Sequence, residues 1–290
     1  MTDAQTRQAA SYVLTLVCPD RAGIVHAVTG MLVEHDGNIE ESQQYGDWSE
    51  GRFFMRVRFA VDPDPGIETL RGAFLPIAER FGMWWELWEA AAPYRTLILV
   101  SKFSHCLNDL LFRWSKESLQ IDVVAIVSNH LDCKALADSY EVPYHHIPVT
   151  PETKRQAESH MLGLVDSLGV DLVVLARYMQ VLSDETCKAL TGRAINIHHS
   201  FLPSFKGARP YHQAFDRGVK LVGATAHYVT GDLDEGPIIE QDVMRVDHGY
   251  DAAALAAAGR DVESQVLSRA VRWHAESRVL LNGHKTVVFR

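Results

Sequence analysis

The first 90 residues show two kinds of hydrophobic repeat, one with strand periodicity and one with helix periodicity. Apolar runs predict strands, whereas Ile24, Val28, Met31 and Leu32 share one face of a helix. The tripeptide Asp36-Gly37-Asn38 tolerates positive φ and is expected to end that helix. In chain order, the expected elements are a strand at 11–17, a helix from Ile24, strands at 39–45 and 52–61, a helix at 67–81 and a strand at 83–87. The order is βαββαβ, although Pro76 weakens the second helix.

After an alanine-rich stretch at 90–92, apolar strands and amphipathic helices alternate, so we place one domain at 9–90 and a second at 95–290. The second domain is expected to hold strands at 96–101, 121–128, 144–148, 171–176 and 194–198, with helices at 107–114, 134–140, 151–168 and 184–190. Such alternation predicts an α/β, Rossmann-like domain with a mostly parallel sheet covered on both faces. Ligands of such sheets usually bind beyond the carboxyl ends of the strands.

Composition narrows the class of protein. Hydrophobic residues make up 47% and charged residues 22% of the chain, and the formal net charge of -9 argues against a nucleic-acid partner. The N-terminal residues lack the apolar core of a signal peptide, and no apolar run approaches the roughly 20 residues of a membrane span. The four cysteines are scattered without a CxxC pair. We therefore expect a cytoplasmic protein with reduced thiols and no membrane partner.

The candidate chemistry lies at the end of the strand at 194–198. Asn196 and His198 are two residues apart, so their side chains share one face of the strand. A glycine-punctuated loop at 230–237 can bring Asp234 over the sheet. An amide, an imidazole and a carboxylate suit acyl transfer to water: Asp234 as base, directly or through His198, with Asn196 and His198 stabilising the oxyanion. His198 can also protonate the departing nitrogen. On spacing alone, turn formation and a solvated loop remain competing interpretations.

A multi-part motif resembles the signature of the folate-dependent formyltransferase superfamily. It comprises Ile195–His198, Ser200, Leu202-Pro203, Gly207, His227, Leu233-Asp234 and Gly236-Pro237. The resemblance implies that Asn196, His198 and Asp234 form the catalytic trio and that His227 supports the aspartate. It also implies substrate contacts from Met179, Gln180, Val181, Leu182, His227 and Gly236, the segment 179–182 lining a pterin pocket largely through main-chain groups.

The acceptor of the formyl group separates the branches of this superfamily. Residues 101–109 contain no glycine, which argues against the phosphate cradle of an enzyme with a phosphorylated amine acceptor. That stretch, with 206–213 and 259–263, resembles the formyltetrahydrofolate deformylases. The resemblance implies hydrolysis of 10-formyltetrahydrofolate to formate and tetrahydrofolate, with formate supplied to one-carbon and purine metabolism. The alternatives are a formyltransferase with an amine acceptor and an amino-acid-binding regulator whose catalytic domain has decayed.

The N-terminal βαββαβ pattern with the segment 19–25 resembles an ACT domain, a ferredoxin-like amino-acid-sensing module. This resemblance implies a homo-oligomer, a dimer or tetramer, and an amino-acid effector near Asp20, Gly23 and Ile24; the alternative is that Gly23 merely starts a helix. We expect the tryptophans at 84, 85 and 88 to lie in the core or at an interface. No metal is expected, because adjacent histidines in a strand point to opposite faces and no HExxH run occurs. No cofactor is expected besides the folate substrate.

Overall fold

The computed structural model describes residues 10–202 and 210–290, and the chain divides into two compact units. Unit 1 extends to Ala92 and also includes Glu276–Leu280 and Val287–Arg290, while unit 2 comprises Pro93–Ala275 and Leu281–Thr286. The boundary at 92 and 93 lies between the expected limits of 90 and 95. The expected second domain, 95–290, differs from unit 2 because most of its last 15 residues belong to unit 1. Among the described residues, no helix combines the length and apolarity that a membrane crossing requires.

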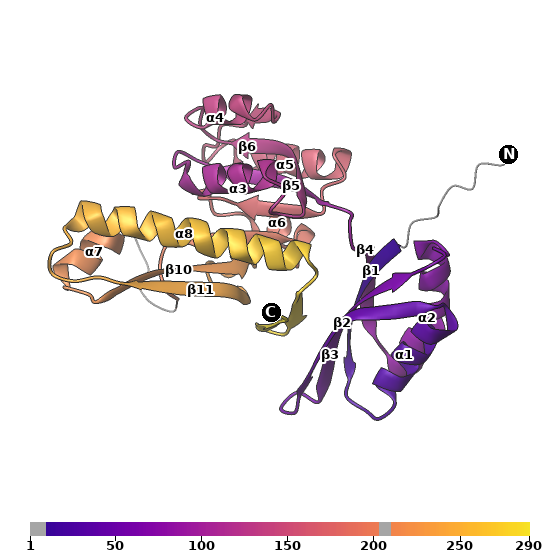
Figure 1. Ribbon diagram of the computed structural model, residues 1–290. Helices are drawn as coiled ribbons and strands as arrows, with labels where there is room; N and C mark the ends of the chain where they lie inside the picture. Colours follow the sequence, from indigo (N-terminus) through magenta and orange to yellow (C-terminus); the bar gives the residue numbers. More distant parts are fainter. Residues whose placement is uncertain (1–9, 203–209) are drawn as a thin grey trace. The chain divides into compact units, whose positions relative to one another are not determined.

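Unit 1 has the predicted βαββαβ order. Its elements are β1 (Ala10–Pro19), α1 (Ile24–Glu34), β2 (Gly37–Asp47), β3 (Arg52–Val61), α2 (Ile67–Phe81) and β4 (Trp84–Glu89). The strands form an antiparallel sheet in the order β2-β3-β1-β4, and both helices lie on the same face of it (Figure 1). Between sheet and helices lies one apolar core, to which Leu14 and Leu16 of β1 and Phe74 of α2 contribute. The ferredoxin-like prediction is therefore confirmed.

Helix α2 continues through Pro76, which lies inside it. A proline lacks the N–H that would bond the carbonyl four residues earlier, here that of Gly72. Both residues are on the exposed side of the helix, where water can bond this carbonyl, whereas Leu70, Phe74 and Ala78 are buried on the other side. The apolar face thus holds the helix together despite the missing hydrogen bond.

The second face of the unit 1 sheet is covered by the C-terminal residues of the chain. Leu280 and Phe289 pack against Val17 and Phe54 in a small apolar cluster. Beside it Arg56, 2% exposed, donates from Nε and Nη2 to the carbonyl oxygen of Glu276. Val17 of β1 and Phe54 of β3 are apolar side chains on this face, and the C-terminal residues cover them.

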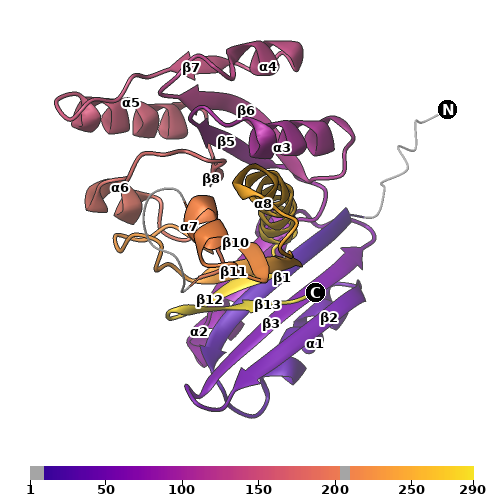
Figure 2. The ribbon, with the colours of Figure 1, turned by 90° about the vertical axis from the view of Figure 1, so that its left-hand side faces the viewer.

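Unit 2 contains a seven-stranded sheet in the order β11-β10-β9-β8-β5-β6-β7 (Figure 2). Its strands are β5 (Tyr94–Val100), β6 (Ile121–Ser128), β7 (Tyr144–His146), β8 (Leu172–Leu175), β9 (Ala194–His198), β10 (Leu221–Tyr228) and β11 (Ile238–Arg245). Strands β5 to β9 run parallel, and β10 and β11 extend the sheet antiparallel. The prediction of a mostly parallel α/β sheet is confirmed.

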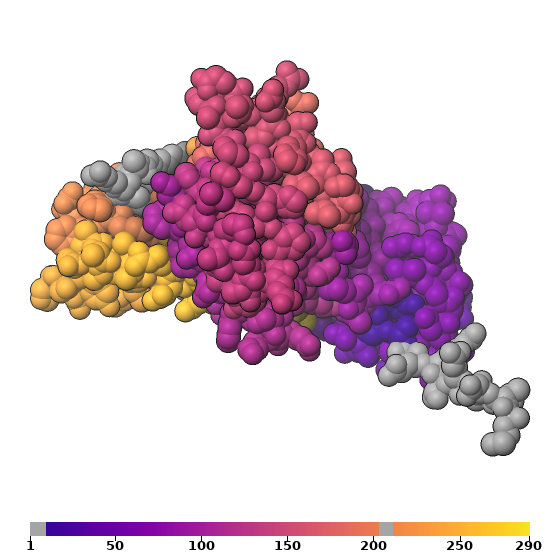
Figure 3. All heavy atoms as spheres, turned by 90° about the horizontal axis from the view of Figure 1, so that it is seen from above, coloured from indigo at the N-terminus to yellow at the C-terminus, as the bar shows by residue number. Residues whose placement is uncertain are grey.

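The helices of unit 2 are α3 (His105–Ser115), α4 (Lys134–Ser139), α5 (Lys154–Ser167), α6 (Asp184–Ala189), α7 (Pro210–Asp216) and α8 (Ala252–Ala275). Figure 3 shows the magenta and pink segments that carry α3 to α6 as one closely packed body. Helix α8 lies along β10 and β11 (Figure 1) and was not among the predicted elements. Its buried face includes Glu263 and Ser268, and these polar residues interrupt the apolar repeat that marks a helix in a sequence. The hairpin β12 (Val279–Asn282) and β13 (Lys285–Val288) was not predicted either.

Candidate active site

The candidate site begins at the carboxyl end of β9. In the antiparallel pairing with β10, Asn196 lies opposite His227 and His198 opposite Thr225. Directly opposed residues of neighbouring strands point to the same face of the sheet. The side chains of Asn196, His198 and His227 therefore share one face, and Asn196 Nδ2 lies 3.2 Å from His227 Nε2.

The loop between β10 and β11 places Asp234 against this row of side chains. Its Oδ2 lies 3.2 Å from Nδ1 of His198, and its Oδ1 lies 3.7 Å from Nε2 of His227. Asp234 has a φ of 58°, a left-handed conformation that aspartate tolerates better than most residues. The structure thus brings Asn196, His198 and Asp234 together, as the spacing of the motif predicts.

Electrostatics keep the Asp234 carboxylate ionised. Burial raises its pKa, but hydrogen bonds and charge from His198 and His227 outweigh burial, so the pKa lies well below the ordinary value. The other ring nitrogen of His198, Nε2, lies 2.8 Å from Oγ of Ser200. Both nitrogens of His198 are therefore engaged, which fixes the orientation of the ring.

These residues line a pocket of about 280 Å³. The segment Met179–Leu182 after β8 contributes one wall, and Asn196, His198, His227 and Asp234 contribute to the rest. Leu182 is buried, whereas Met179 and Val181 are more than half exposed, so apolar side chains border the opening. Gly236 is not among the lining residues; it lies behind the loop, against Tyr228.

Two further residues of the pocket wall, Arg177 and His199, were not singled out by the sequence analysis. The His199 ring stacks on that of His198, with the ring centres 4.9 Å apart. Burial, followed by the positive charges of Arg177 and His198, lowers the pKa of His199 to about 4. His199 is therefore neutral near pH 7. Arg177 stands out in the structure by its φ of 65°, and no sequence pattern could have indicated this conformation.

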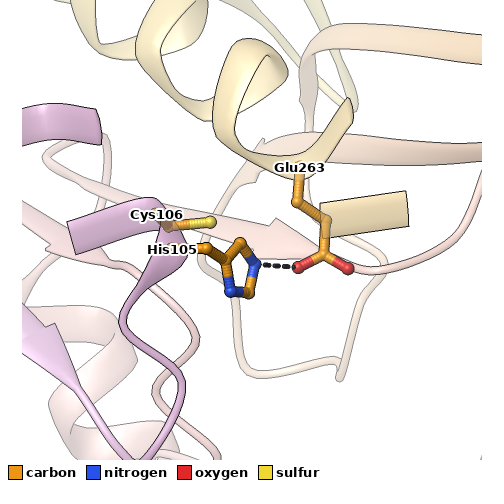
Figure 4. A group of neighbouring side chains, drawn as sticks. All are labelled: His105, Cys106 and Glu263. Carbon is orange, nitrogen blue, oxygen red and sulfur yellow. Dashed lines mark hydrogen bonds and ion pairs between the residues drawn. The ribbon is translucent and has the colours of Figure 1, made fainter. Parts of the chain in front are cut away.

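A cluster behind the pocket joins α3 to α8. The buried carboxylate of Glu263 lies 2.7 Å from Nε2 of His105 (Figure 4). It also accepts a 2.6 Å hydrogen bond from the hydroxyl of Tyr211. Nε of Arg177 lies 3.4 Å from the same carboxylate. Cys106 is adjacent, and burial raises the pKa of its thiol well above the ordinary value. His105, Cys106 and Glu263 have the spacing of metal ligands, but a protonated thiol and the neighbouring arginine cation suit a network of hydrogen bonds better.

The residues expected to bind an effector lie at the first turn of unit 1. Gly23 precedes α1 with a φ of 95°, a conformation that glycine adopts without strain. The side chain of Ile24 is buried in the core of unit 1, so only its main chain is available to a ligand. Asp20 is exposed. The turn geometry accounts for Gly23 without a ligand, and effector binding stays a prediction.

Part of the sequence motif lies outside the described residues. Pro203 and Gly207 fall in the gap at 203–209, as does the first part of the stretch 206–213. The stretch 259–263 is described, and Gly259 has a clear reason there: a Cβ at this position would lie 2.0 Å from the hydroxyl oxygen of Tyr211. Gly259 thus lets Tyr211 reach Glu263 across the surface of α8.

Comparison with known proteins agrees with this division of the chain. An ACT domain family model matches residues 12–74, and a Formyl transferase family model matches residues 94–271. A formyltetrahydrofolate deformylase of Corynebacterium sp. (strain P-1) is 57% identical over 96% of this chain and 98% of its own length. The chain belongs to the formyltetrahydrofolate deformylase family. A second member, from Bacillus subtilis (strain 168), is 47% identical over 95% of this chain and 93% of its own length.

Solved structures separate the deformylase family from the transferases. A crystal structure of the formyltetrahydrofolate deformylase of Burkholderia mallei has a TM-score of 0.94 and 54% identity, and the match covers 97% of this chain and 100% of that one. Glycinamide ribonucleotide transformylase 1 of Symbiobacterium toebii has a TM-score of 0.65 and 28% identity, covering 71% of this chain and 98% of that one. Of these two structures, the deformylase matches nearly the whole chain, whereas the transformylase matches 71% of it.

Proposed function

We propose that this protein hydrolyses 10-formyltetrahydrofolate to formate and tetrahydrofolate, as a hydrolase of a C–N amide bond. One observation carries the proposal: the ionised Asp234 carboxylate lies 3.2 Å from His198 in a pocket that also presents Asn196. Membership of the deformylase family favours water over an amine as the acceptor. The product formate is a one-carbon unit available to purine synthesis.

In the proposed mechanism, Asp234 activates water directly or through His198. Water is a weak nucleophile, so a base must accept its proton as its oxygen bonds to the formyl carbon. Asp234 is suited to this role because its low pKa keeps it unprotonated near pH 7. His198 contacts the same carboxylate and is placed to relay the proton.

The formyl oxygen becomes negatively charged when water adds, and the side-chain NH2 of Asn196 and the His198 ring are the proposed donors for it. Loss of one such donor typically costs about 10²–10³ in rate. Collapse of the intermediate breaks the bond from carbon to N10, and N10 takes up a proton from His198. Formate leaves as an anion and releases one proton to solvent, which balances the reaction. No cofactor is required by these steps.

Substrate binding is proposed to use the wall at 179–182. The main-chain N–H of Met179 donates to Oγ of Ser101, 3.0 Å away, and so is already engaged. The main-chain N–H of Ser183 is likewise bonded to Glu158. The groups left for a pterin are therefore the carbonyls of this segment and the N–H groups of Gln180 to Leu182. Met179 and Val181 offer apolar contact to the ring.

The formyltransferase alternative is disfavoured by the loop after β5. Residues 101–104 lead into α3, where His105 is bonded to Glu263. Because it contains no glycine, this loop is poorly suited to bring free main-chain N–H groups around the phosphate of an amine acceptor. A retained Asp234, His198 and Asn196 arrangement likewise argues against a decayed catalytic domain.

The decisive experiment is an assay of 10-formyltetrahydrofolate with and without candidate amine acceptors, following formate and tetrahydrofolate together. Hydrolysis predicts equal amounts of both products without any acceptor. A requirement for an amine, or folate binding without turnover, would contradict it.

Three further properties are proposed for the chain as a whole. The ACT domain is proposed to bind an amino-acid effector near Asp20 and Gly23, and to associate with other copies in a dimer or tetramer. A cytoplasmic location agrees with four buried cysteines that form no disulfide. Titration with amino acids and measurement of molecular mass in solution test the first two, and fractionation of cells tests the third.

A further inference from the structure

Arg177 adopts a backbone conformation that arginine rarely takes. Its φ of 65° lies in the left-handed region, where the Cβ of most residues is crowded. Its carbonyl oxygen accepts a hydrogen bond from the N–H of Ser101, which directly follows the neighbouring strand β5. Strained residues of this kind persist where the surrounding structure holds them, and they cluster at functional sites. The strained backbone of Arg177 therefore points to a functional role for its side chain.

That side chain is an under-partnered cation in the wall of the pocket. It is 10% exposed, and it lines the same pocket as His198 and Asp234. Its Nε faces Glu263 at 3.4 Å, outside hydrogen-bond geometry, and its Nη1 has no hydrogen-bond partner among residues 10–202 and 210–290. The guanidinium lies 5.6 Å from the ring centre of Phe103. Buried guanidinium groups normally find oxygen acceptors, so this one is suited to bind an anion in the pocket.

The position of Arg177 is close to the reacting groups. Strands β8 and β9 are parallel, with Leu175 beside Asn196, so Arg177 and His198 each follow two residues later at the same edge of the sheet. The His199 ring stacks on that of His198, and the positive charge of Arg177 helps to lower the pKa of His199. Glu263 does not fully neutralise the charge of Arg177, because the two oxygens of Glu263 already accept hydrogen bonds from His105 and Tyr211.

We propose that Arg177 binds the carboxylate of formate when hydrolysis produces it. The inference rests on the proposed function, because formate is the anion that the reaction creates from a neutral formyl group. A guanidinium can hold a carboxylate with two parallel hydrogen bonds. It also offsets the repulsion between formate and the Asp234 carboxylate in the same pocket. The glutamate carboxylates of the folate are the other source of this chemistry, but a buried cation at the reacting end favours the small product.

The test compares Arg177→Gly with wild type. Glycine suits a φ of 65°, so this variant removes the side chain without backbone strain, and thermal unfolding verifies that it folds. Line broadening of 13C-labelled formate in the presence of tetrahydrofolate measures formate binding directly, independently of turnover. Product inhibition of hydrolysis by formate gives a second value. Arg260→Ala, an exposed arginine on α8, is the matched control.

We expect formate binding to weaken at least about tenfold in Arg177→Gly, as for a lost charge-assisted hydrogen bond, and to be unchanged in Arg260→Ala. Arg177→Lys should retain part of the affinity. Unchanged formate affinity in Arg177→Gly overturns the proposal. If wild type binds formate through Arg177 but produces none without an amine, the proposed function fails while the anion site stands.

Two further experiments test other roles for Arg177. If Arg177 only neutralises Glu263, the double variant Arg177→Gly/Glu263→Gln would regain formate affinity; we expect that it does not. If Arg177 binds the glutamate tail, Arg177→Gly would raise KM for the full substrate but not for a 10-formyl substrate that lacks glutamate, and formate affinity would be unchanged. Either of those results contradicts the proposal.

Discussion

A Cβ on Gly236 would lie 1.7 Å from the carbonyl oxygen of Tyr228, so only glycine fits where the loop after β10 returns to its strand. The N–H of Tyr228 donates to the carbonyl of Pro237, one residue further along. This close approach closes the loop tightly and holds Asp234, two residues before Gly236, over His198 and His227. The glycine thus acts on the site through the backbone, without lining the pocket.

Gly236→Ala should therefore displace the loop. We expect a loss of about 1–3 kcal/mol in the free energy of unfolding from overpacking, together with a large fall in kcat. Gly231→Ala is a suitable control, because a Cβ there meets only the flexible carboxylate of Asp184, at 3.2 Å. Denaturant unfolding and steady-state kinetics measure both effects, and equal behaviour of the two variants would contradict this account of the loop.

Asp234→Asn should nearly abolish hydrolysis while folate binding remains measurable. The amide cannot accept the proton of water, and loss of a positioned base typically lowers kcat by about 10²–10⁴. Single-turnover kinetics and a binding titration with a folate analogue separate the two effects. Retention of more than a tenth of wild-type kcat would exclude Asp234 as the base.

The depressed pKa of Asp234 also predicts a pH dependence of stability. In the unfolded chain this carboxyl has its ordinary pKa of 3.8, and in the folded chain its pKa is lower. Its contribution to stability is thus fully present above that ordinary value and is lost as the pH falls through the folded pKa. Asp234→Asn should flatten the stability profile in that acidic window. Parallel profiles for the variant and wild type below pH ~4 would contradict the shift.

Arg56 is expected to stabilise unit 1. Arg56→Met removes two hydrogen bonds to the carbonyl of Glu276 and an ion pair with Glu41, which keeps its other ion pair with Arg278. We expect a loss of about 2–3 kcal/mol in the free energy of unfolding, and faster hydrogen exchange at residues 276–280. Arg58→Met removes an exposed ion pair with Glu40 and an exposed hydrogen bond to Ser11, and it should cost less than about 1 kcal/mol. Similar losses in both variants would show that the carbonyl contacts of Arg56 contribute little.

Pro76→Ala should stabilise the protein. Alanine restores the hydrogen bond to the carbonyl of Gly72 within α2, and the exposed position needs no repacking. Allowing for the greater freedom of the unfolded chain, we expect a gain of about 1–2 kcal/mol by denaturant titration. Glu79→Ala, on the same exposed side, is the control for helix propensity alone. No gain beyond that control would mean that the helix has adjusted fully to the proline.

Particular residues show which parts of the structure were predictable. Leu14 and Leu16 of β1, like the buried positions of α1, repeat with the period of their element, so the sequence predicts both the element and its buried face. Asn196 and His198 could be placed on one face of a strand by the same rule. Glu263 could not be placed, since a buried carboxylate in a helix looks like a solvent-exposed position until its partners Tyr211 and His105 are known.

The sequence by itself determined the local order of strands and helices and the residues that carry the chemistry, because hydrophobic period and residue type are properties of short segments. Only the tertiary structure decided which surfaces those segments cover and which charges meet. The return of residues 276–280 and 287–290 to unit 1 and the burial of Arg177 beside His199 both arise from packing between segments far apart in the chain. Periodicity records that a face is buried, but it does not record what covers that face.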